Sequence, residues 1–474
     1  MNILAQALTL TNNSFNENSF SQSLRSYISP HSLANPAINY AQFCEGFDTF
    51  IHSLCRTILI ETLEKMDLEF RNSPHRTAQY YVKQTRTRTI ITLWGEITYK
   101  RTEYIDRRTN KPYCYVDRKL GLLKRMRFDV AVCSLIYEAY SRDVSMTSVG
   151  RNIGERIHGY SLSHNRQLHY ISRQSVWNIL NRFKEIHFPE TPQETIPEVL
   201  YVMADEKYVP TQRDPNHKKR MVKTAAVFES RKKVGKNRYE LVNKRYFSFL
   251  EGQFWPQFLD HLTNIYDLTK VKQIYIMGDG ADWIKAGVNI INSQDVHVKY
   301  ASDRFHVFQA IGHITKDKKL QSILLDYVIH NKRKDFNKIV DSILQQETSE
   351  SRIKTITEKR NYIISSFQGI QVMYKSVKIG CSMEQVISHI LARHLASIPK
   401  AYSYNRLPTY VNNRINQENG IDLRIAYLQA IDKGKDKHGK VYLDSQKLDF
   451  SLFDKHCETS YHLPFPDFYL EKKY

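Results

Sequence analysis

Hydrophobic positions along the chain change their spacing several times, and each change predicts a different kind of element. Residues 40–70 place apolar side chains three and four positions apart, which predicts an amphipathic helix. Residues 85–105 alternate instead, and Gly95 interrupts the alternation, so we expect a β-hairpin followed by a further strand at 112–118. Helical spacing returns over residues 129–185.

Two stretches of that helical region, residues 148–157 and 171–186, could form a helix-turn-helix. Ser172 stands where the second helix would have its N-cap. Arg173 and Gln174 then fall on the first turn, where a recognition helix exposes the side chains that read bases. An ordinary pair of helices would give the same pattern, so both interpretations remain open at this stage.

A proline-containing segment at residues 191–199 predicts a linker, and the character of the chain changes after it. Three strands, a helix, a strand, a helix and a strand follow, which predicts an α/β domain with a mixed sheet. Residues 307–397 indicate only helices and loops. The expected strands are 199–209, 221–230, 238–250, 271–280 and 296–303, and the first expected helix is 254–266.

Composition limits the class of protein. The 474 residues allow roughly three domains. No apolar stretch is long enough for a transmembrane helix, and no basic segment at the start indicates a secretory signal. The six cysteines form no CxxC pair, so neither a disulfide framework nor a zinc ribbon is expected. These features favour a reducing cytoplasmic setting.

Charge points to a polyanionic partner, with nucleic acid first and an anionic membrane surface second. The chain has 69 basic and 49 acidic residues, a net charge of +20. Residues 1–70 carry three basic and seven acidic residues, whereas residues 71–127 carry 15 and four. We therefore expect a boundary near residue 70 and contacts to DNA phosphates from the basic segment, through Arg86, Arg88, Lys100, Arg101, Arg107, Arg108, Lys124, Arg125 and Arg127.

Together these changes predict five regions. They are an N-terminal helical region (1–70), a basic β-rich module (71–120), a helix-turn-helix region (121–190), an α/β domain (195–405) with a helical insertion at about 310–380, and a C-terminal basic region (406–474).

Three expected strands of the α/β domain carry an aspartate within or just after their apolar run: Asp205, Asp279 and Asp303. Ligand sites in open α/β sheets lie outside the strand ends, and hard carboxylate oxygens suit Mg²⁺ or Mn²⁺. Aspartates also cap helices and begin turns, so a structural role remains open for each. Glu206 alternates to the face opposite Asp205 and cannot easily share an ion with it.

Two further residues are candidates for the same site. Glu384 opens an amphipathic helix, although a first-turn glutamate is often only a partner of the helix dipole. His306 follows Asp303 by three positions, so the two could share a metal or form a hydrogen-bonded pair. We favour the pair because nothing nearby completes a zinc set. Phosphate-loop and seryl-nucleophile motifs are absent.

With these residues in place, the chain resembles the ISLre-two family of bacterial insertion-sequence transposases, a branch of the DDE transposases related to Mutator-like enzymes. The resemblance runs in the family's order over roughly residues 70 to 405. The matching stretches are TIITLWGEITYKRTEY (89–104), ISRQSVWN (171–178), ADEKYV (204–209), GDGADWIK (278–285), DRFHVFQAI (303–311) and EQVISHILARHLASIPKAYS (384–403).

The resemblance implies an RNase H-like catalytic domain whose Asp205, Asp279 and Glu384 bind two Mg²⁺ or Mn²⁺ ions. Asp303 and His306 match an accessory signature outside that triad. It further implies hydrolysis at the ends of a mobile element and strand transfer into target double-stranded DNA, by a homo-oligomer assembled on DNA in the bacterial nucleoid. Arg173 and Gln174 are then expected to read terminal-repeat bases.

Three other functions remain to be separated from this one. An RNase H-like nuclease would cut without strand transfer, and a DNA-binding protein with a decayed catalytic domain would not cut. A membrane-surface protein is disfavoured because no strongly amphipathic basic helix is present.

Overall fold

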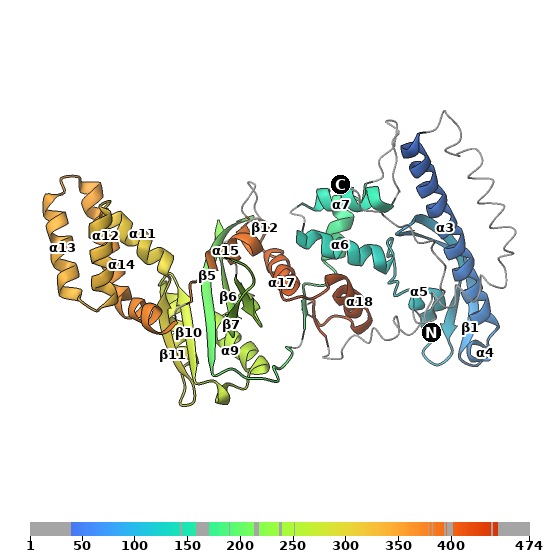
Figure 1. Cartoon of the computed structure of the whole chain (residues 1–474). Coiled ribbons are helices and arrows are strands. Elements are labelled where there is room, and N and C mark those ends of the chain that lie inside the picture. Colours follow the sequence, from blue (N-terminus) through green and yellow to red (C-terminus); the bar gives the residue numbers. More distant parts are fainter. Residues whose placement is uncertain are drawn as a thin grey trace, which may run out of the picture.

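The computed structural model shows an extended molecule in which successive parts of the chain lie side by side (Figure 1). A helix and a small sheet lie at one end, a group of helices follows, a mixed sheet lies beyond it, and a helical insertion forms the other end. The structure describes residues 39–142, 145–157, 170–188, 190–212, 218–236, 239–250, 252–377, 379–381, 383–392, 395, 402–437 and 439–443. Parts of the regions expected at 1–70 and 406–474 lie outside these residues.

A long helix packs against a three-stranded sheet at the start of the described chain. The helix begins at Asn39, whose side chain and that of Gln42 bond each other's backbone in a capping box. The amphipathic helix and the hairpin expected from the sequence are both confirmed. The elements are α3 (Tyr40–Asn72), α4 (Pro74–Gln79), β1 (Tyr80–Thr92) and β2 (Gly95–Asp106).

The prediction of a strand at residues 112–118 is wrong over most of that range. Only Pro112–Tyr113 pairs with the sheet, as β3, and Tyr115–Lys119 forms helix α5. Asp117 in the first turn of α5 accepts a hydrogen bond from the Arg88 guanidinium of β1. This contact comes from a distant part of the sequence, so the local apolar pattern does not reveal it.

Three helices in mutual contact follow, in the region expected to hold a helix-turn-helix. Ser172 caps α8 as expected, because its Oγ accepts a hydrogen bond from the Ser175 amide at 3.2 Å. A Cβ on Gly150 of α7 would lie 2.1 Å from the Ile171 carbonyl oxygen, so glycine permits the close packing of α7 and α8. The elements are α6 (Val130–Arg142), α7 (Met146–Ile157), α8 (Arg173–Leu180) and, where the helix was expected to continue, the short strand β4 (Glu185–His187).

A mixed sheet with the strand order β11-β10-β5-β6-β9 forms the centre of the next part. Strands β5, β10 and β11 are mutually parallel, and β6 and β9 are antiparallel to their neighbours. The expected mixed α/β sheet and its succession of strands and helices are confirmed. The strands are β5 (Val199–Gln212), β6 (Lys219–Phe228), β9 (Arg245–Phe249), β10 (Gln273–Gly278), β11 (His297–Ser302) and β12 (Tyr402–Ser403), which pairs with the end of β5.

The single strand expected at residues 238–250 is wrong, because the segment divides between two sheets. Strand β8 (Tyr239–Val242) pairs with β7 (Ser230–Lys233) in a separate ribbon, while β9 joins the mixed sheet. Asn243 lies between them with a φ of 51°. This left-handed conformation interrupts an extended strand and is tolerated best by glycine and asparagine.

The two faces of the mixed sheet are covered by different helices. Leu200, Val202 and Ala204 of β5 are fully buried beneath α9 (Phe254–Ile265) and α10 (Asp282–Ile291). Side chains alternate along a strand, so Met203 and its odd-numbered neighbours face the other layer. There they meet α15 (Met383–Ile387) and the π-helical turn η3 (Ser388–Ala392). Leu268 of the 3-10 turn η1 (Leu268–Lys270) packs against the core on the α9 side of the sheet.

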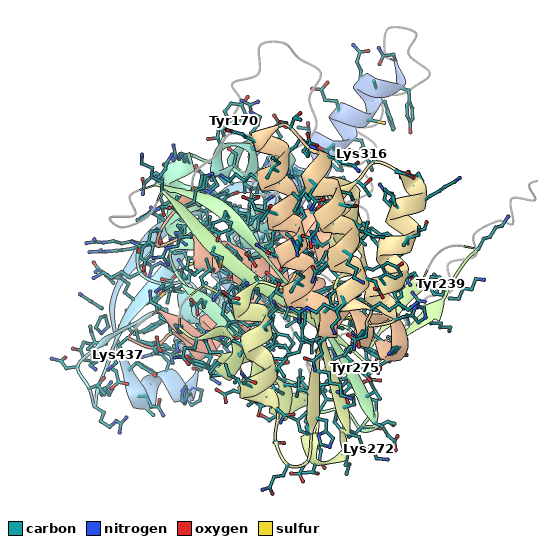
Figure 2. The ribbon with its side chains drawn as sticks, turned by 90° about the vertical axis from the view of Figure 1, so that its left-hand side faces the viewer. Tyr170, Tyr239, Lys272, Tyr275, Lys316 and Lys437 are labelled. Carbon is teal, nitrogen blue, oxygen red and sulfur yellow. The ribbon has the colours of Figure 1, made fainter. Side chains whose placement is uncertain are left out.

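The residues after β11 form the expected helical insertion, which faces the viewer in Figure 2. Lys316 in that view marks the turn between its first two helices, and Lys272 marks the lower edge of the mixed sheet, just before β10. The insertion has an apolar core of its own, which includes the fully buried Leu324, Phe336 and Ile363. Its elements are α11 (Arg304–Ile314), α12 (Lys318–Ile329), α13 (Arg333–Gln346), α14 (Glu350–Val372) and the π-helical turn η2 (Met373–Val377).

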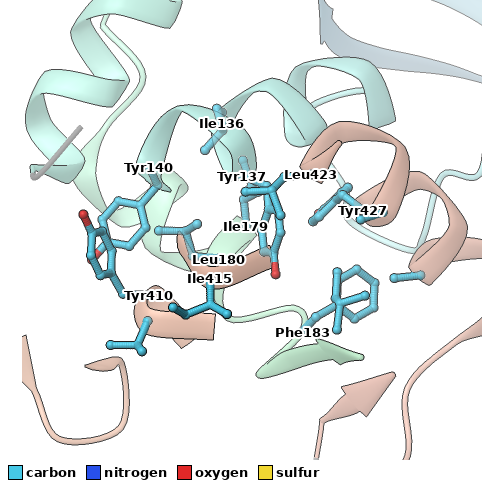
Figure 3. Close-up of a cluster of buried hydrophobic side chains, with 14 of the residues drawn as sticks. Ile136, Tyr137, Tyr140, Ile179, Leu180, Phe183, Tyr410, Ile415, Leu423 and Tyr427 are labelled. Carbon is cyan, nitrogen blue, oxygen red and sulfur yellow. The ribbon is translucent and has the colours of Figure 1, made fainter. Parts of the chain in front are cut away.

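The last described residues return to the helices α6 and α8 rather than forming a unit of their own. Figure 3 shows Tyr137 and Ile179 from the earlier helices packed among Tyr410 and Tyr427 of the later ones. The Tyr137 hydroxyl donates a hydrogen bond to Asn413 Oδ1 at 2.8 Å inside this core. The returning elements are α17 (Leu407–Glu418), α18 (Leu423–Lys433) and β13 (Lys440–Tyr442), which pairs with β4.

Replacing Tyr137 by phenylalanine should lower the free energy of unfolding by about 1–3 kcal/mol, because the buried Asn413 carbonyl loses its donor. Urea denaturation measures the change. Tyr442→Phe is the control, since that ring is 55% exposed. Equal stability of Tyr137→Phe and the parent would show that the hydrogen bond does not hold these helices together.

Asp129 before α6 should make stability depend on pH. Burial raises the pKa of its carboxyl to about 6, although the Val132 amide donates to it at 2.7 Å. A folded-state pKa above the unfolded value means that stability is lost as pH rises from about 4 to 6. Asp129→Asn keeps a hydrogen-bond acceptor but carries no charge. At pH 7.5 it should increase the free energy of unfolding by about 2–3 kcal/mol, which raises the urea midpoint, and near pH 4 it should change the free energy of unfolding little. A variant less stable than the parent at pH 7.5 would contradict this.

Candidate functional site

Two of the predicted acids come together at the centre of the mixed sheet. Met203 of β5 pairs with Met277 of β10 in parallel register, and Asp205 and Asp279 each follow two residues later. Residues two apart on a strand share a face, and parallel neighbours lie about 4.8 Å apart. The two half-buried carboxylates therefore stand side by side on the face that α15 covers.

Glycines on both sides of Asp279 allow this arrangement. A Cβ on Gly278 would lie 2.8 Å from the Ala204 carbonyl oxygen, so β10 approaches β5 closely only with glycine at this position. Gly280 has a φ of 100°, which lets the chain turn at once into α10. The Ala281 amide donates to Asp279 Oδ1 at 2.9 Å and fixes the carboxylate in the turn.

The surroundings of Asp205 disfavour its charged form. Burial raises the pKa of Asp205 to about 6, the carboxylate of Asp279 adds to the rise, and His306 acts to lower it. Glu206 donates its amide to Asp205 Oδ1 at 2.7 Å, but its own carboxylate accepts from Trp283 Nε1 at 2.6 Å. Glu206 thus faces away from Asp205, as the alternation predicted.

Asp303 and His306 lie at the same edge of the sheet. The Asp303 amide donates to the Gly278 carbonyl at 2.8 Å, and Asp303 Oδ1 caps α11 by accepting from the Phe305 amide at 3.0 Å. His306 Nε2 lies 3.7 Å from Asp303 Oδ2. The structure thus brings the predicted pair together, and Asp303 also ties the start of the insertion to β10.

Glu384 belongs to α15, the helix packed on the Asp205 face of β5, but its side chain lies outside the described residues. Ser382, its expected N-cap, also lies outside them. Three positions before Glu384 is Cys381, whose pKa is raised by burial and by Asp303, Asp205 and Asp279. The described segment just before Glu384 therefore runs beside the carboxylates.

Two tyrosines complete the surroundings, and neither was predicted as a site residue from the sequence. The Tyr300 hydroxyl donates to the Gly278 carbonyl at 2.9 Å. Burial, Asp279 and Asp303 all raise the pKa of Tyr362, which reaches the site from α14 of the insertion. Its hydroxyl is buried and has no hydrogen-bond partner among the described residues. Because α14 is so distant in sequence, only the folded chain reveals this contact.

The donor set suits a hard divalent cation. Asp205, Asp279 and Glu384 would supply carboxylate oxygens, which Mg²⁺ and Mn²⁺ prefer. Among the side chains that the structure describes, no three His, Cys, Asp or Glu residues are close enough to hold a metal.

The predicted DNA-contacting residues of the basic segment divide into two groups. The side chains of Arg88 and Arg101 are only 10% and 14% exposed, and both pair with Asp117, at 2.5 and 3.3 Å. Arg88 also donates to two backbone carbonyls, so we assign these two arginines a structural role in place of the predicted phosphate contact. The exposed members are Arg86, Lys100, Arg107, Arg108, Lys124, Arg125 and Arg127, of which Arg86 lies 3.8 Å from Glu103.

The first turn of α8 presents Arg173 and Gln174 to solvent, as a recognition helix requires. Trp177 is 44% exposed on the same helix, and Gln174 Nε2 donates to Asn178 Oδ1 at 3.0 Å. Trp177 and Asn178 were not among the predicted residues, although their spacing of three and four positions from Gln174 indicates a shared helix face. Across the ranges described above, no helix is long and apolar enough to cross a membrane.

Comparisons with known proteins place the chain in a family. The model of the uncharacterised protein family UPF0236 matches residues 33–430, a span that holds every candidate site residue. Two similar proteins are UPF0236 proteins of Caldanaerobacter subterraneus subsp. tengcongensis. Each is 24% identical over 399 residues, which cover 83% of this chain and 80% or 76% of the relative. The chain belongs to the UPF0236 family.

Proposed function

We propose that this protein is a DDE-type DNA transposase with an RNase H-like catalytic domain, as its resemblance to the ISLre-two transposases implies. The observation that carries the proposal is the parallel pairing of Met203 with Met277, because Asp205 and Asp279 each follow two residues later. If the five strands are numbered by their order in the chain, the sheet from β9 to β11 has the order third, second, first, fourth, fifth. Placing the fourth strand beside the first is what brings these two acids together, and the helix of Glu384 covers the same face.

The proposed division of labour follows from the contacts. Bound by Asp205, Asp279 and Glu384, Mg²⁺ or Mn²⁺ supplies Lewis-acid activation of water and stabilises charge at the phosphate. Asp303 anchors the start of α11 to β10 through its amide, and His306 lies beside the Asp303 carboxylate. Tyr362 of α14 adds a buried hydroxyl to the surroundings of these carboxylates.

The proposed reaction has two displacements at phosphorus. Water attacks a phosphodiester at the element end, the bond between phosphorus and the 3′ oxygen breaks, and the leaving oxygen takes up a proton to give a 3′ hydroxyl. That hydroxyl then attacks a target phosphodiester, loses its proton and displaces a second 3′ oxygen. Both steps form one P–O bond and break another, so no oxidant or covalent protein–DNA intermediate is needed.

DNA would be held by two separate surfaces. The exposed cations of the basic segment suit phosphate oxygens, whereas the exposed face of α8 carries Arg173 and Gln174, which suit base edges in the major groove. A nuclease that cuts without strand transfer needs no such reading helix. We therefore place strand transfer ahead of simple cleavage, and homo-oligomeric assembly on paired ends remains part of the proposal.

The metal-triad proposal predicts that the full-length protein cuts a duplex bearing the element's own ends in Mg²⁺ or Mn²⁺. Asp205→Asn, Asp279→Asn and Glu384→Gln should each lower cleavage at least about 100-fold, because each removes a ligand of a group worth several kcal/mol. Asp282→Asn, which alters an exposed acid at the start of α10, should leave cleavage unchanged. Full cleavage by Asp279→Asn would rule out the triad.

The same assay separates the alternatives. Cleaved ends that join target DNA support a transposase, and cleavage without joining indicates a nuclease. Tight binding of the ends without cleavage in either metal indicates a DNA-binding protein whose catalytic domain has decayed.

The two DNA surfaces should respond differently to mutation. Arg107→Ala with Arg108→Ala should weaken binding to any duplex and reduce the log–log salt slope by about 0.9 per lost phosphate contact. Arg173→Ala with Gln174→Ala should instead reduce the preference for element ends over unrelated DNA by about tenfold or more. Filter binding at several salt concentrations measures both. Lys272→Ala is the control, since this exposed lysine precedes β10 of the mixed sheet and belongs to neither surface. If both double variants lose the same affinity for element ends and for unrelated DNA, the two surfaces do not have separate roles.

A further inference from the structure

Two large apolar side chains stand exposed directly after the Asp303 cap. Phe305 is 53% exposed and Phe308 is 48% exposed, one helical turn apart on α11. Residues three apart share a helix face, so the two rings form one patch. A patch of this kind at the edge of a proposed active site calls for an explanation, whereas a single exposed apolar residue does not.

The core of the insertion does not need these rings. The opposite side of α11 already supplies Val307, Ala310, Ile311 and Ile314, all of them buried in that core. Phe305 and Phe308 therefore contribute little to folding of the insertion and remain available to a ligand.

The patch adjoins the carboxylates. The ring of Phe305 packs edge-on against that of His306, with centroids 5.6 Å apart, and His306 Nε2 lies 3.7 Å from Asp303 Oδ2. The Asp303 amide in turn bonds the carbonyl of Gly278, the residue before Asp279. An unbroken series of contacts thus leads from the exposed rings to the proposed cutting site.

The charges around α11 favour a polyanion over an apolar protein surface. Arg304 is exposed beside Phe305, and its guanidinium lies 4.5 Å from the Tyr374 ring centroid. Lys316, Lys318 and Lys319 are exposed at the other end of the helix. Aromatic rings flanked by cations are the usual platform for unpaired bases, because stacking tolerates any base and the cations attract the backbone.

We propose that Phe305 and Phe308 stack an unpaired DNA base next to the phosphate that is cut. This inference deepens the proposed function and rests on it. An enzyme that acts on duplex ends gains access to the phosphate when the adjoining pair opens, and opening costs a few kcal/mol. Stacking on the two rings offsets that cost, so the platform selects ends that have opened.

The test measures the affinity of the full-length protein for end duplexes in Ca²⁺, with one mismatch placed at each position within two nucleotides of the cut. The parent should bind one mismatched duplex at least about tenfold more tightly than the paired duplex, because the cost of opening is already met. Phe305→Ala with Phe308→Ala should lose this preference, and an abasic site at the same position should abolish it in the parent. Phe305→Trp should retain it.

Ile323→Ala is the matched control, since this residue is 39% exposed on α12 of the same insertion. No mismatch preference in the parent, or a preference kept by the double variant, would overturn the platform. Weaker binding to every duplex alike would also overturn it and indicate that the patch contacts protein. Binding in Ca²⁺ does not depend on cleavage, so the two proposals can fail separately. If the parent prefers the mismatched duplex but cuts no DNA in Mg²⁺ or Mn²⁺, base stacking by Phe305 and Phe308 is supported and the proposed transposase activity is contradicted.

Discussion

The parallel pairing of β5 with β10 is the constraint on which the rest of this molecule depends. Its register sets Asp205 beside Asp279, and a slip of one residue would turn one of them to the opposite face of the sheet. Gly278 permits the close approach of the two strands, and the Asp303 amide bonds the carbonyl of the same glycine. One backbone position therefore aligns the first two carboxylates and anchors the helix that begins the insertion. Mutations that shift this register should alter the site before they alter the fold.

The chain surrounds this centre with segments that come from far apart in the sequence. The insertion brings Tyr362 to the carboxylates from α14, and the last described helices pass back to α6 and α8 through a buried core. The Tyr137–Asn413 hydrogen bond joins residues from opposite sides of the mixed sheet in chain order. Because α17 also packs on β9, the helix that presents Arg173 and Gln174 is connected to the mixed sheet by packed side chains rather than by the linker alone. A DNA end held on α8 would thereby keep a defined relation to the carboxylates.

Local pattern revealed most of the elements but few of the contacts between them. The alternation of β5 and the apolar run of β10 were sufficient to find the strands and to set Glu206 apart from Asp205, and Ser172 identified the start of α8. Pattern failed at residues 112–118 and 238–250, where a distant ion pair with Asp117 and the left-handed Asn243 decide the outcome. It also could not separate the exposed Arg107 from the buried Arg88, since both are simply basic residues in a basic segment. The approach of Tyr362 to Asp279 and Asp303 depends on the tertiary structure, and no local sequence pattern predicts it.

The most direct test of the central claim is whether residues 205, 279 and 384 surround one shared metal-binding site. Fe²⁺ substituted for Mg²⁺ generates radicals that cut the polypeptide near the ion, and mass spectrometry locates the cuts without any knowledge of the DNA. The account predicts cuts near Asp205, near Asp279 and in the segment from Cys381 to Glu384, all suppressed by excess Mg²⁺ and all lost together in Asp279→Asn. Cuts near only one of these segments, or cuts that survive in Asp279→Asn, would contradict it.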